Sequence, residues 1–210
     1  MAATRKQGTT VVDITYCCNA ACKYCQWGRS NNRLQRHLSL DEILVSGETI
    51  NALGTTRIVL SGGEPRLHPQ LSEILAHYRK YVDSLIVLTN GYGLDRSEIL
   101  NLKRMGATGV TVSLDSILSK QSMQTKETPS DIHKKIISNI AETCNHAREF
   151  EFGINSVVSH ETANWKTISE ILEFSQKQQL DFVKFQPIFN DGYVEQNAPQ
   201  CCPLQTTVIS

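Results

Sequence analysis

The chain has 210 residues, about the length of one domain with a small appendage. Its 21 basic and 21 acidic residues leave no formal net charge, which argues against bulk electrostatic binding of nucleic acid or anionic lipid. The composition, 40% hydrophobic and 20% charged, is that of a compact globular chain. No apolar run approaches the roughly 18 residues that cross a bilayer, and the N-terminus lacks the apolar stretch of a secretory signal. We therefore expect a cytoplasmic protein with no membrane partner.

Six segments rich in β-branched and apolar residues predict strands, and helical patterns separate them. The strands are expected at residues 9–16, 57–60, 84–88, 109–114, 152–158 and 182–185. A capping box formed by Ser39 and Glu42 predicts the start of the first long helix, and Gly54 predicts its end. Apolar residues at helical spacing predict further helices near residues 71–78, 99–105, 130–144 and 165–172.

This alternation of strands and helices predicts an α/β fold with parallel strands and right-handed crossovers. An open doubly wound sheet and a partial (β/α) barrel both satisfy the pattern. In either fold a ligand site lies at the carboxyl ends of the strands. We expect residues 1–10 to be a flexible N-terminal segment and residues 11–190 to be the domain. Helical periodicity fades after Asn190, so residues 191–210 are expected to be an irregular tail.

Seven cysteines are unusual for a reducing compartment, where crowded cysteines usually bind a metal or do redox work. Cys18, Cys22 and Cys25 have the spacing C-x3-C-x2-C and follow the first strand. Three thiolates on one loop can bind three irons of a cubane [4Fe–4S] cluster and leave the fourth iron open.

Three other interpretations of the cysteines stay open. A structural zinc site needs four ligands, and His37 is a conceivable fourth. Counting from Cys17 gives the ferredoxin-like spacing C-x4-C-x2-C, for which Cys144 is the nearest further cysteine. The third alternative is a group of reduced thiols with no ligand.

A second motif helps to choose among these interpretations of the cysteines: Gly62-Gly63-Glu64-Pro65 follows the second strand directly. A C-x3-C-x-aromatic-C loop after the first strand together with this motif resembles the radical S-adenosylmethionine (radical SAM) superfamily. The resemblance extends from about Val11 to Ile188 and implies a partial (β/α)6 TIM-type barrel.

The resemblance also implies an activity and its cofactors. Cys18, Cys22 and Cys25 would ligate a [4Fe–4S] cluster, and S-adenosyl-L-methionine (SAM) would occupy the open iron. Reductive cleavage of SAM would then give a 5′-deoxyadenosyl radical that abstracts hydrogen from a peptide or small-metabolite substrate. The expected partners are that substrate and a low-potential electron donor such as flavodoxin or ferredoxin. The subclass (oxidoreductase, epimerase or transferase) is left open.

Further site residues follow from the resemblance. The glycines Gly62 and Gly63 would let backbone approach the methionyl part of SAM, and Glu64 would be the anionic partner of its ammonium group. The other candidates, most of them at strand ends, are expected to contact the adenine, ribose or carboxylate of SAM: Tyr24, Ser61, Asn90, Ser113, Asp115, Asn155, Gln186 and Ile188.

Several residues outside the two motifs have simpler expectations. Lys120 and Lys126 are expected to be solvated loop lysines rather than ligands of the SAM carboxylate. Four histidines show no mutual spacing typical of catalysis or of a second metal and are expected on the surface: His68, His77, His133 and His146.

The tail adds candidates for one further catalytic role. Cys201 and Cys202 are candidate hydrogen-atom donors to a substrate radical, and a pair of tail cysteines without a catalytic part is the alternative.

Two other functions compete with the radical enzyme: an iron–sulfur electron carrier, and a catalytically idle SAM-binding relative. The first leaves the Gly-Gly-Glu-Pro motif unexplained, and the second would usually have lost a cysteine or the glutamate.

Overall fold

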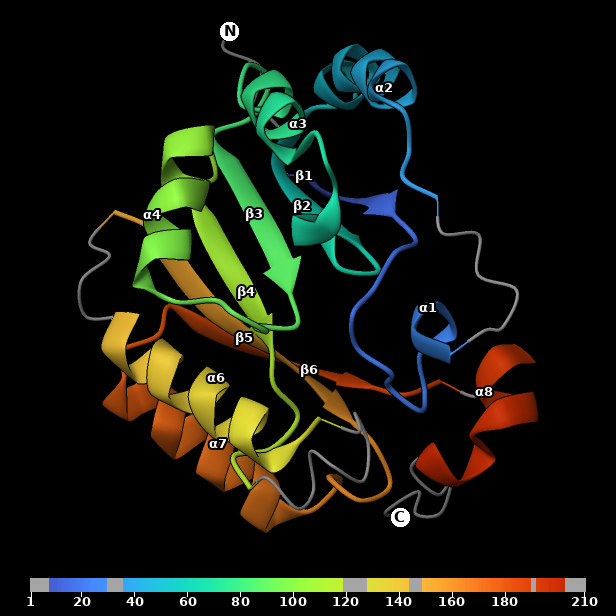
Figure 1. Ribbon diagram of the computed structural model, residues 1–210, viewed down its shortest axis with the longest axis vertical. Helices are drawn as coiled ribbons and strands as arrows, with labels where there is room; N and C mark the ends of the chain where they lie inside the picture. The colour runs from blue at the N-terminus through green and yellow to red at the C-terminus, as the bar shows by residue number, and fades with distance from the viewer. Residues whose placement is uncertain (1–7, 30–35, 119–127, 144–148, 190–191, 203–210) are drawn as a thin grey trace, which may run out of the picture.

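The computed structural model describes residues 8–29, 36–118, 128–143, 149–189 and 192–202. Within these ranges six parallel strands form one sheet whose spatial order follows the sequence (Figure 1). The strands are β1 (Gly8–Thr15), β2 (Thr55–Gly62), β3 (Ser84–Thr89), β4 (Gly109–Ser113), β5 (Glu151–Val158) and β6 (Phe182–Pro187). The sheet curls into a half-barrel, which confirms the partial barrel and rejects the doubly wound alternative.

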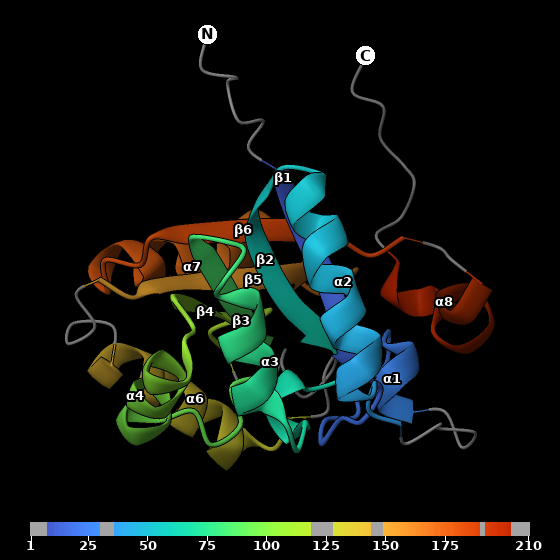
Figure 2. The same cartoon turned by 90° about the horizontal axis from the view of Figure 1, so that it is seen from above.

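Helices lie on the outer, convex side of this sheet, as the view from above shows (Figure 2). The helices that connect consecutive strands are α2 (Leu40–Ala52), α3 (Leu71–Tyr78), α4 (Arg96–Met105), α6 (Ser130–Thr143) and α7 (Trp165–Lys177). Two short elements complete the loops after β1 and β2, namely α1 (Gln26–Arg29) and the 3-10 turn η1 (Pro65–Leu67).

Local sequence explains where the helices begin and end. Ser39 and Glu42 form the predicted capping box of α2: the Ser39 hydroxyl accepts from the Glu42 amide, and the Glu42 carboxylate accepts from the Ser39 amide. Asp95 caps α4 in the same way by accepting from the Glu98 amide at 2.9 Å. Gly106 ends α4 at a φ of 111°, a left-handed conformation that favours glycine.

The hydrophobic core lies between the convex face of the sheet and the helices. Because side chains alternate along a strand, core residues occupy every second position of the central strands. Those from β2 to β5 are at most 3% exposed: Ile58, Leu60, Leu85, Val87, Val110, Val112, Phe152 and Ile154. The positions between them line the concave face, where Ser113, Asn155 and Lys184 lie side by side in register.

An ion pair lies at the amino end of the sheet, opposite the expected ligand site. Arg57 on β2 donates to both carboxylate oxygens of Glu151 on β5 and to the Ser84 hydroxyl. The guanidinium also lies 5.8 Å from the centre of the Phe182 ring, a cation–π distance. Gly153 leaves room for that ring, since a Cβ atom there would lie 2.3 Å from it. These groups line the amino end of the half-barrel.

The segment after β6, where we expected irregular structure, contains α8 (Gly192–Asn197) and the 3-10 turn η3 (Pro199–Cys201). Val194, Ala198 and Cys201 are at most 3% exposed and have the helical spacing i, i+4, i+7. The Cys201 carbonyl accepts from the amide of His160 at 2.9 Å, which ties this segment to the loop after β5. Burial of these three side chains therefore gives the segment its order.

Two of the histidines expected on the surface are buried, so that prediction is wrong for them. His68 is 3% exposed and His133 is 2% exposed. His68 lies between a carbonyl and an amide: its Nε2 is 2.9 Å from the Leu38 carbonyl, and its Nδ1 accepts from the Gln70 amide. His133 Nε2 similarly lies 2.9 Å from the Ser116 carbonyl. Each ring satisfies buried backbone groups, and this explains a polar side chain in the interior.

Four other positions lie outside the described residues: Lys120, Lys126, Cys144 and His146. No helix in the described ranges is long and apolar enough to span a bilayer.

His68 should make stability depend on pH. Burial lowers the pKa of His68 below its ordinary value of 6.5. The unfolded chain therefore takes up a proton at a higher pH than the folded chain does, and folding stability is lost as the pH falls through 6.5 towards the lowered pKa. We expect urea unfolding to give a smaller free energy at pH 5.5 than at pH 7.5. In His68→Gln this difference should shrink, and an equal difference in both proteins would contradict the assignment.

Candidate functional site

The cysteine loop, residues 16–25, joins β1 to α1 and carries the three cysteines of the C-x3-C-x2-C motif. None of Cys18, Cys22 and Cys25 is in a disulfide, and all three are partly buried. The Cys25 amide donates to the Cys22 carbonyl at 3.2 Å, and the Cys18 sulfur accepts from the Ala20 amide at 3.4 Å. The loop therefore folds around its own sulfurs.

Cys17 and His37 form a separate contact beside this loop. The Cys17 sulfur lies 3.6 Å from His37 Nε2, and His37 Nδ1 lies 2.9 Å from the Thr15 hydroxyl. Thr15 and His37 also form an antiparallel bridge at the free edge of β1. The zinc interpretation adds His37 to the motif, and the ferredoxin-like interpretation adds Cys17. In the structure these two residues contact each other at the edge of β1.

The donor set of the loop suits an iron–sulfur cluster. In the described parts of the chain, no three His, Cys, Asp or Glu side chains are grouped so as to hold one metal ion. In a cubane cluster each thiolate binds its own iron, and soft sulfur ligands match iron. Cys18, Cys22 and Cys25 provide three such ligands on one loop.

Gly62 and Gly63 fix the cysteine loop against the end of β2. The Gly63 amide donates to the Thr15 carbonyl at 2.8 Å, and the next amide, that of Glu64, donates to the Cys17 carbonyl at 2.7 Å. A Cβ atom on Gly62 would lie 2.2 Å from the Thr15 oxygen, and one on Gly63 would lie 2.1 Å from the Cys17 oxygen. The protein's own backbone closely approaches both glycines, and their contact with the methionyl part of SAM stays a prediction.

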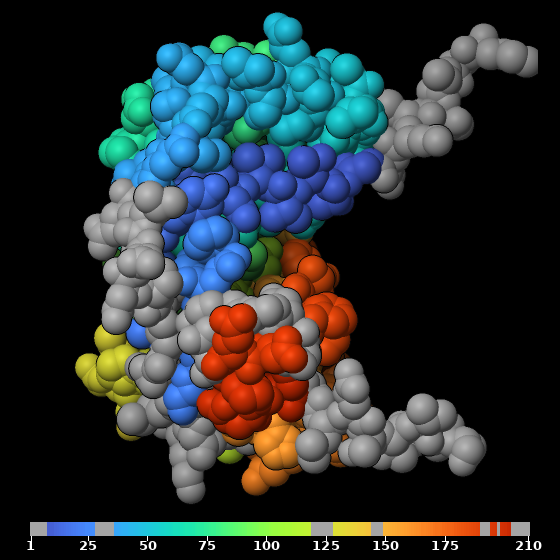
Figure 3. Space-filling model, turned by 90° about the vertical axis from the view of Figure 1, so that its right-hand side faces the viewer, coloured from blue at the N-terminus to red at the C-terminus, as the bar shows by residue number. Residues whose placement is uncertain are grey.

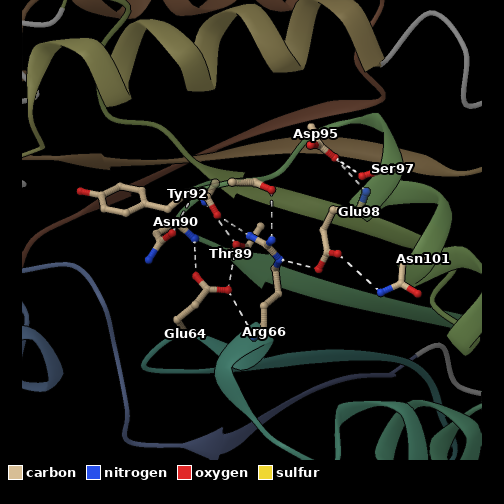
Figure 4. Close-up of polar contacts among 11 residues, drawn as sticks. Glu64, Arg66, Thr89, Asn90, Tyr92, Asp95, Ser97, Glu98 and Asn101 are labelled. Atoms are coloured by element: carbon tan, nitrogen blue, oxygen red, sulfur yellow. Dashed lines mark hydrogen bonds and ion pairs between the residues drawn. The ribbon is translucent and has the colours of Figure 1, made fainter.

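Glu64 is buried among donors of its own chain. Its side chain accepts from the Thr89 hydroxyl at 2.8 Å, from the Asn90 amide at 2.8 Å and from the Arg66 amide at 3.3 Å (Figure 4). The residue is only 2% exposed, and this burial raises the pKa of its carboxyl although the hydrogen bonds oppose the shift. These contacts give the acid a structural task at the end of β3, and its contact with a methionyl ammonium stays a prediction.

Arg66 and Asn90 extend this network to the neighbouring loops. Arg66 donates to Glu98 on α4 and to the carbonyls of Tyr92 and Gly93 (Figure 4). The Asn90 side chain donates to Asn19 Oδ1 in the cysteine loop at 2.7 Å. The ends of β2 and β3 and the cysteine loop are therefore one hydrogen-bonded unit.

Tyr24 connects the other side of the cysteine loop to β4 and β5. Its hydroxyl donates to Asp115 Oδ2 at 2.6 Å, and Asp115 Oδ1 accepts from the Val157 amide at 2.9 Å. Burial and the charge of Asp115 raise the pKa of Tyr24 well above its ordinary value, so the phenol stays protonated and able to donate. The structure pairs the two side chains, and their contact with SAM stays a prediction.

A cavity of about 270 Å³ lies between the cysteine loop, the end of β6 and α8. On the corresponding face of the molecule, a recess separates β1 from β6 and α8 (Figure 3). Three predicted site residues line the cavity, namely Tyr24, Gln186 and Ile188. The remaining lining residues are Cys25, Gln26, Trp27, Val157, Pro187, Phe189 and Val194. The cavity thus has both apolar and polar walls and touches one of the cluster cysteines.

The concave face of the sheet carries the other predicted polar residues. Ser61 lies on β2 beside Asp13 of β1, and Ser113 at the end of β4 lies beside Asn155 of β5. The Asn155 Oδ1 atom is buried and has no hydrogen-bond partner in the structure. An unsatisfied buried acceptor is costly, and its presence here favours a ligand that donates to it.

Cys201 and Cys202 lie apart from the cavity lining. Cys201 is 0% exposed within η3, and its role as a hydrogen-atom donor stays a prediction. Cys202 is partly exposed and stays a candidate.

The site residues that sequence reasoning missed come from three places. Asn19 and Trp27 belong to the cysteine loop and α1, where proximity to the motif was the available signal. Thr89 directly precedes Asn90, but its contact with Glu64 could be recognised only from the fold. Val194 comes from α8, where the spacing of Val194, Ala198 and Cys201 was the overlooked signal.

Fold and site together define a half-barrel protein with a three-cysteine loop at the carboxyl ends of its strands. The family model of the radical SAM superfamily matches residues 12–175, and the chain belongs to that superfamily. Family and fold identify it as an enzyme of the radical SAM type. Membership implies the use of SAM and of an iron–sulfur cluster.

The matches to individual relatives cover only part of each relative's length. The GTP 3′,8-cyclase of Photorhabdus laumondii subsp. laumondii is 37% identical over 113 residues, which are 52% of this chain and 34% of the relative. Streptococcus suis SuiB bound to S-adenosylmethionine has a TM-score of 0.69 at 18% identity, over 90% of this chain and 43% of SuiB. HydG, a maturase of the [FeFe]-hydrogenase, has a TM-score of 0.72 at 13% identity, over 89% of this chain and 44% of HydG. The two structures share the fold with this chain, which spans less than half the length of each of the three relatives.

The close backbone approach at Gly63 predicts a large effect of a single methyl group. Gly63→Ala should destabilise the protein by about 1–3 kcal/mol, because the Cys17 carbonyl or the β2 end must move. Gly8→Ala is the control, since a Cβ atom there would meet its nearest neighbour at 3.7 Å. Urea unfolding should give a change below about 1 kcal/mol for the control. Equal stability of the two variants would contradict the role assigned to Gly63.

The Tyr24 hydroxyl should contribute more to stability than a hydroxyl with a neutral acceptor. Tyr24→Phe removes a hydrogen bond to a carboxylate oxygen of the buried Asp115, which costs about 1.5–3 kcal/mol. Tyr92→Phe removes a 3.2 Å bond to the neutral Thr128 hydroxyl, worth about 0.5–1.5 kcal/mol. Thermal or urea unfolding measures the loss of stability in the two variants. A smaller loss of stability in Tyr24→Phe than in Tyr92→Phe would show that the contact with Asp115 is unimportant.

Proposed function

We propose that this chain binds a [4Fe–4S] cluster through Cys18, Cys22 and Cys25 and cleaves SAM reductively at it. Bound there, the cluster would supply one electron to SAM and so release methionine and a 5′-deoxyadenosyl radical, which abstracts hydrogen from a substrate. The observation that carries the proposal is the three-thiol loop held by backbone hydrogen bonds against the Gly-Gly-Glu segment. Family membership supports it independently.

The nucleoside part of SAM is proposed to occupy the cavity beside Cys25. At about 270 Å³ the cavity is slightly below the range of roughly 300–1,000 Å³ typical of ligand pockets, so it would enclose part of a nucleoside rather than the whole cofactor. Tyr24, Ile188 and Trp27 supply apolar and aromatic surface for an adenine ring.

Polar contacts to SAM are assigned to the concave face and to the strand ends. Asn155 Oδ1 is a buried acceptor without a partner, so a ribose hydroxyl donating to it would satisfy it. Ser113 is the register neighbour of Asn155 and adds a second hydroxyl-binding group. Ser61 on β2 and Gln186 at the cavity are proposed as further walls.

The contact between Tyr24 and Asp115 would hold the cysteine loop in position. Tyr24 sits between two cluster cysteines, and Asp115 anchors its hydroxyl to the ends of β4 and β5. The chain thereby fixes both ends of the cysteine loop, one at β2 and one at β4–β5, before any ligand arrives. Preorganisation of this kind lowers the cost of binding.

The substrate is proposed to be a peptide or small molecule that lies over the concave face. Asp13 and Lys184, on the two edge strands of the sheet, are both exposed and offer opposite charges to it. One fold relative, SuiB, has been seen with its precursor peptide SuiA, and another relative is a GTP 3′,8-cyclase. A low-potential protein such as flavodoxin or ferredoxin is the proposed electron donor.

The proposed function is tested by anaerobic reconstitution with iron and sulfide, followed by assay of 5′-deoxyadenosine after adding SAM and dithionite. Cys18→Ala, Cys22→Ala and Cys25→Ala should each lose the cluster chromophore and reduce 5′-deoxyadenosine to background. Cys17→Ala is the matched control and should keep both, because its thiol contacts His37 instead.

The outcomes separate the competing functions. A cluster lost in Cys17→Ala but kept in Cys18→Ala would favour the ferredoxin-like spacing and an electron carrier. A normal cluster with SAM binding but no 5′-deoxyadenosine would indicate a catalytically idle relative.

A further inference from the structure

A second cavity of about 270 Å³ lies between helix α6 and the loop that leads from β3 into α4 (Figure 1). Gly91, Tyr92 and Gly93 form the wall on the loop side, and residues of α6 form the other wall. This cavity shares none of its described lining residues with the cavity beside Cys25. It is therefore a separate place where a ligand could bind.

The wall on the loop side is held in place by the protein itself. Gly91 and Gly93 have φ values of 83° and 65°, a left-handed conformation that favours glycine. The Arg66 guanidinium donates to the Tyr92 carbonyl at 2.8 Å and to the Gly93 carbonyl at 3.3 Å. A Cβ atom on Gly93 would meet no atom within 4 Å, so the space beside it is open. The wall is thus formed before any ligand arrives.

The wall on the helix side consists of one polar and one apolar row of side chains. Asp131, Lys135 and Asn139 follow one another at intervals of one helical turn and so lie on the same face of α6. Ile132 and Ile136 form the apolar row beside them. Asp131 and Lys135 are exposed, and no ion pair joins them in the part of the chain that the structure describes. The face therefore offers a negative charge, a positive charge and an amide next to an apolar strip.

Asn139 is the observation that points to a ligand. The residue is only 5% exposed, yet among the described residues its side-chain amide has no hydrogen-bond partner. A buried amide without partners costs free energy, and this amide belongs to the lining of the cavity. Its NH2 group can donate twice and its oxygen can accept. A polar ligand in the cavity would satisfy it.

We propose that this cavity binds a free α-amino acid with an apolar side chain. The ammonium group faces Asp131, and the carboxylate lies between Lys135 and the NH2 group of Asn139, where both contacts are charge-assisted. The apolar side chain lies over Ile132 and Ile136. The volume of about 270 Å³ is just below the range of roughly 300–1,000 Å³ typical of ligand pockets, which suits a molecule of this size. This site goes beyond the proposed function and requires no cluster.

The test is a titration of the full chain with L-leucine, followed by ligand-observed nuclear magnetic resonance. Lys135→Met should weaken the binding of L-leucine about tenfold, because a charge-assisted contact is lost. Its affinity for isoamylamine, which is leucine without the carboxylate, should stay unchanged. Asp131→Asn should likewise weaken L-leucine but leave isocaproate, which is leucine without the amine, unchanged. Lys134→Met is the control, since Lys134 is an exposed lysine of the same helix that does not line the cavity.

A further variant separates binding from folding. Asn139→Leu should weaken the binding of L-leucine, while the free energy of unfolding should stay the same or rise because an unpaired buried amide is removed. A clear loss of stability in Asn139→Leu would instead assign this amide to the packing of α6 and contradict the proposal.

The location of the bound amino acid is checked with Cys18→Ala. L-leucine should bind to this variant as it does to the unmodified chain, because Cys18 does not line the cavity. Absence of saturable binding, binding that Lys135→Met leaves unchanged, or binding lost in Cys18→Ala would each overturn the inference. Absence of a cluster in the unmodified chain would overturn the proposed function alone.

Discussion

The candidate site depends on a close contact between two backbone segments. The end of β2 passes so near the end of β1 that no side chain fits at Gly62 or Gly63. Two amides of this segment donate to the last carbonyl of β1 and to a carbonyl at the start of the cysteine loop. Backbone hydrogen bonds between buried groups are hard to replace once lost, because an unpaired amide or carbonyl costs free energy. The position of the three thiols therefore follows from the strand pairing rather than from the loop alone.

Buried polar groups extend this constraint around the mouth of the half-barrel. Glu64 gathers donors from β3, from the residue directly after it and from the turn between β2 and α3, and Asp115 gathers donors from the cysteine loop and β5. Each carboxylate is at most 2% exposed and each is satisfied by at least two hydrogen bonds. A buried acid is tolerated only when donors surround it, so these two residues hold loops together whether or not a ligand is bound.

Much of this architecture could be predicted from the sequence. Six strands, the capping box at Ser39 and the ends of α2 and α4 follow from local patterns, and the confirmed barrel follows from the resemblance carried by the cysteine and Gly-Gly-Glu motifs. The choice between an open sheet and a barrel could not come from periodicity, because curvature depends on contacts such as that of Phe182 over Gly153. The pairing of Tyr24 with Asp115, 91 residues away, and the burial of His68 beside the Leu38 carbonyl likewise depend on tertiary packing.

The central claim is that the three-thiol loop holds a cluster whose open iron is bound by SAM. The most direct measurement is the electron paramagnetic resonance spectrum of the dithionite-reduced, reconstituted protein before and after SAM is added. The account predicts a signal from a single reduced cluster whose shape changes on addition of SAM, because a new ligand alters the environment of one iron. Identical spectra with and without SAM, at full cluster content, would contradict it.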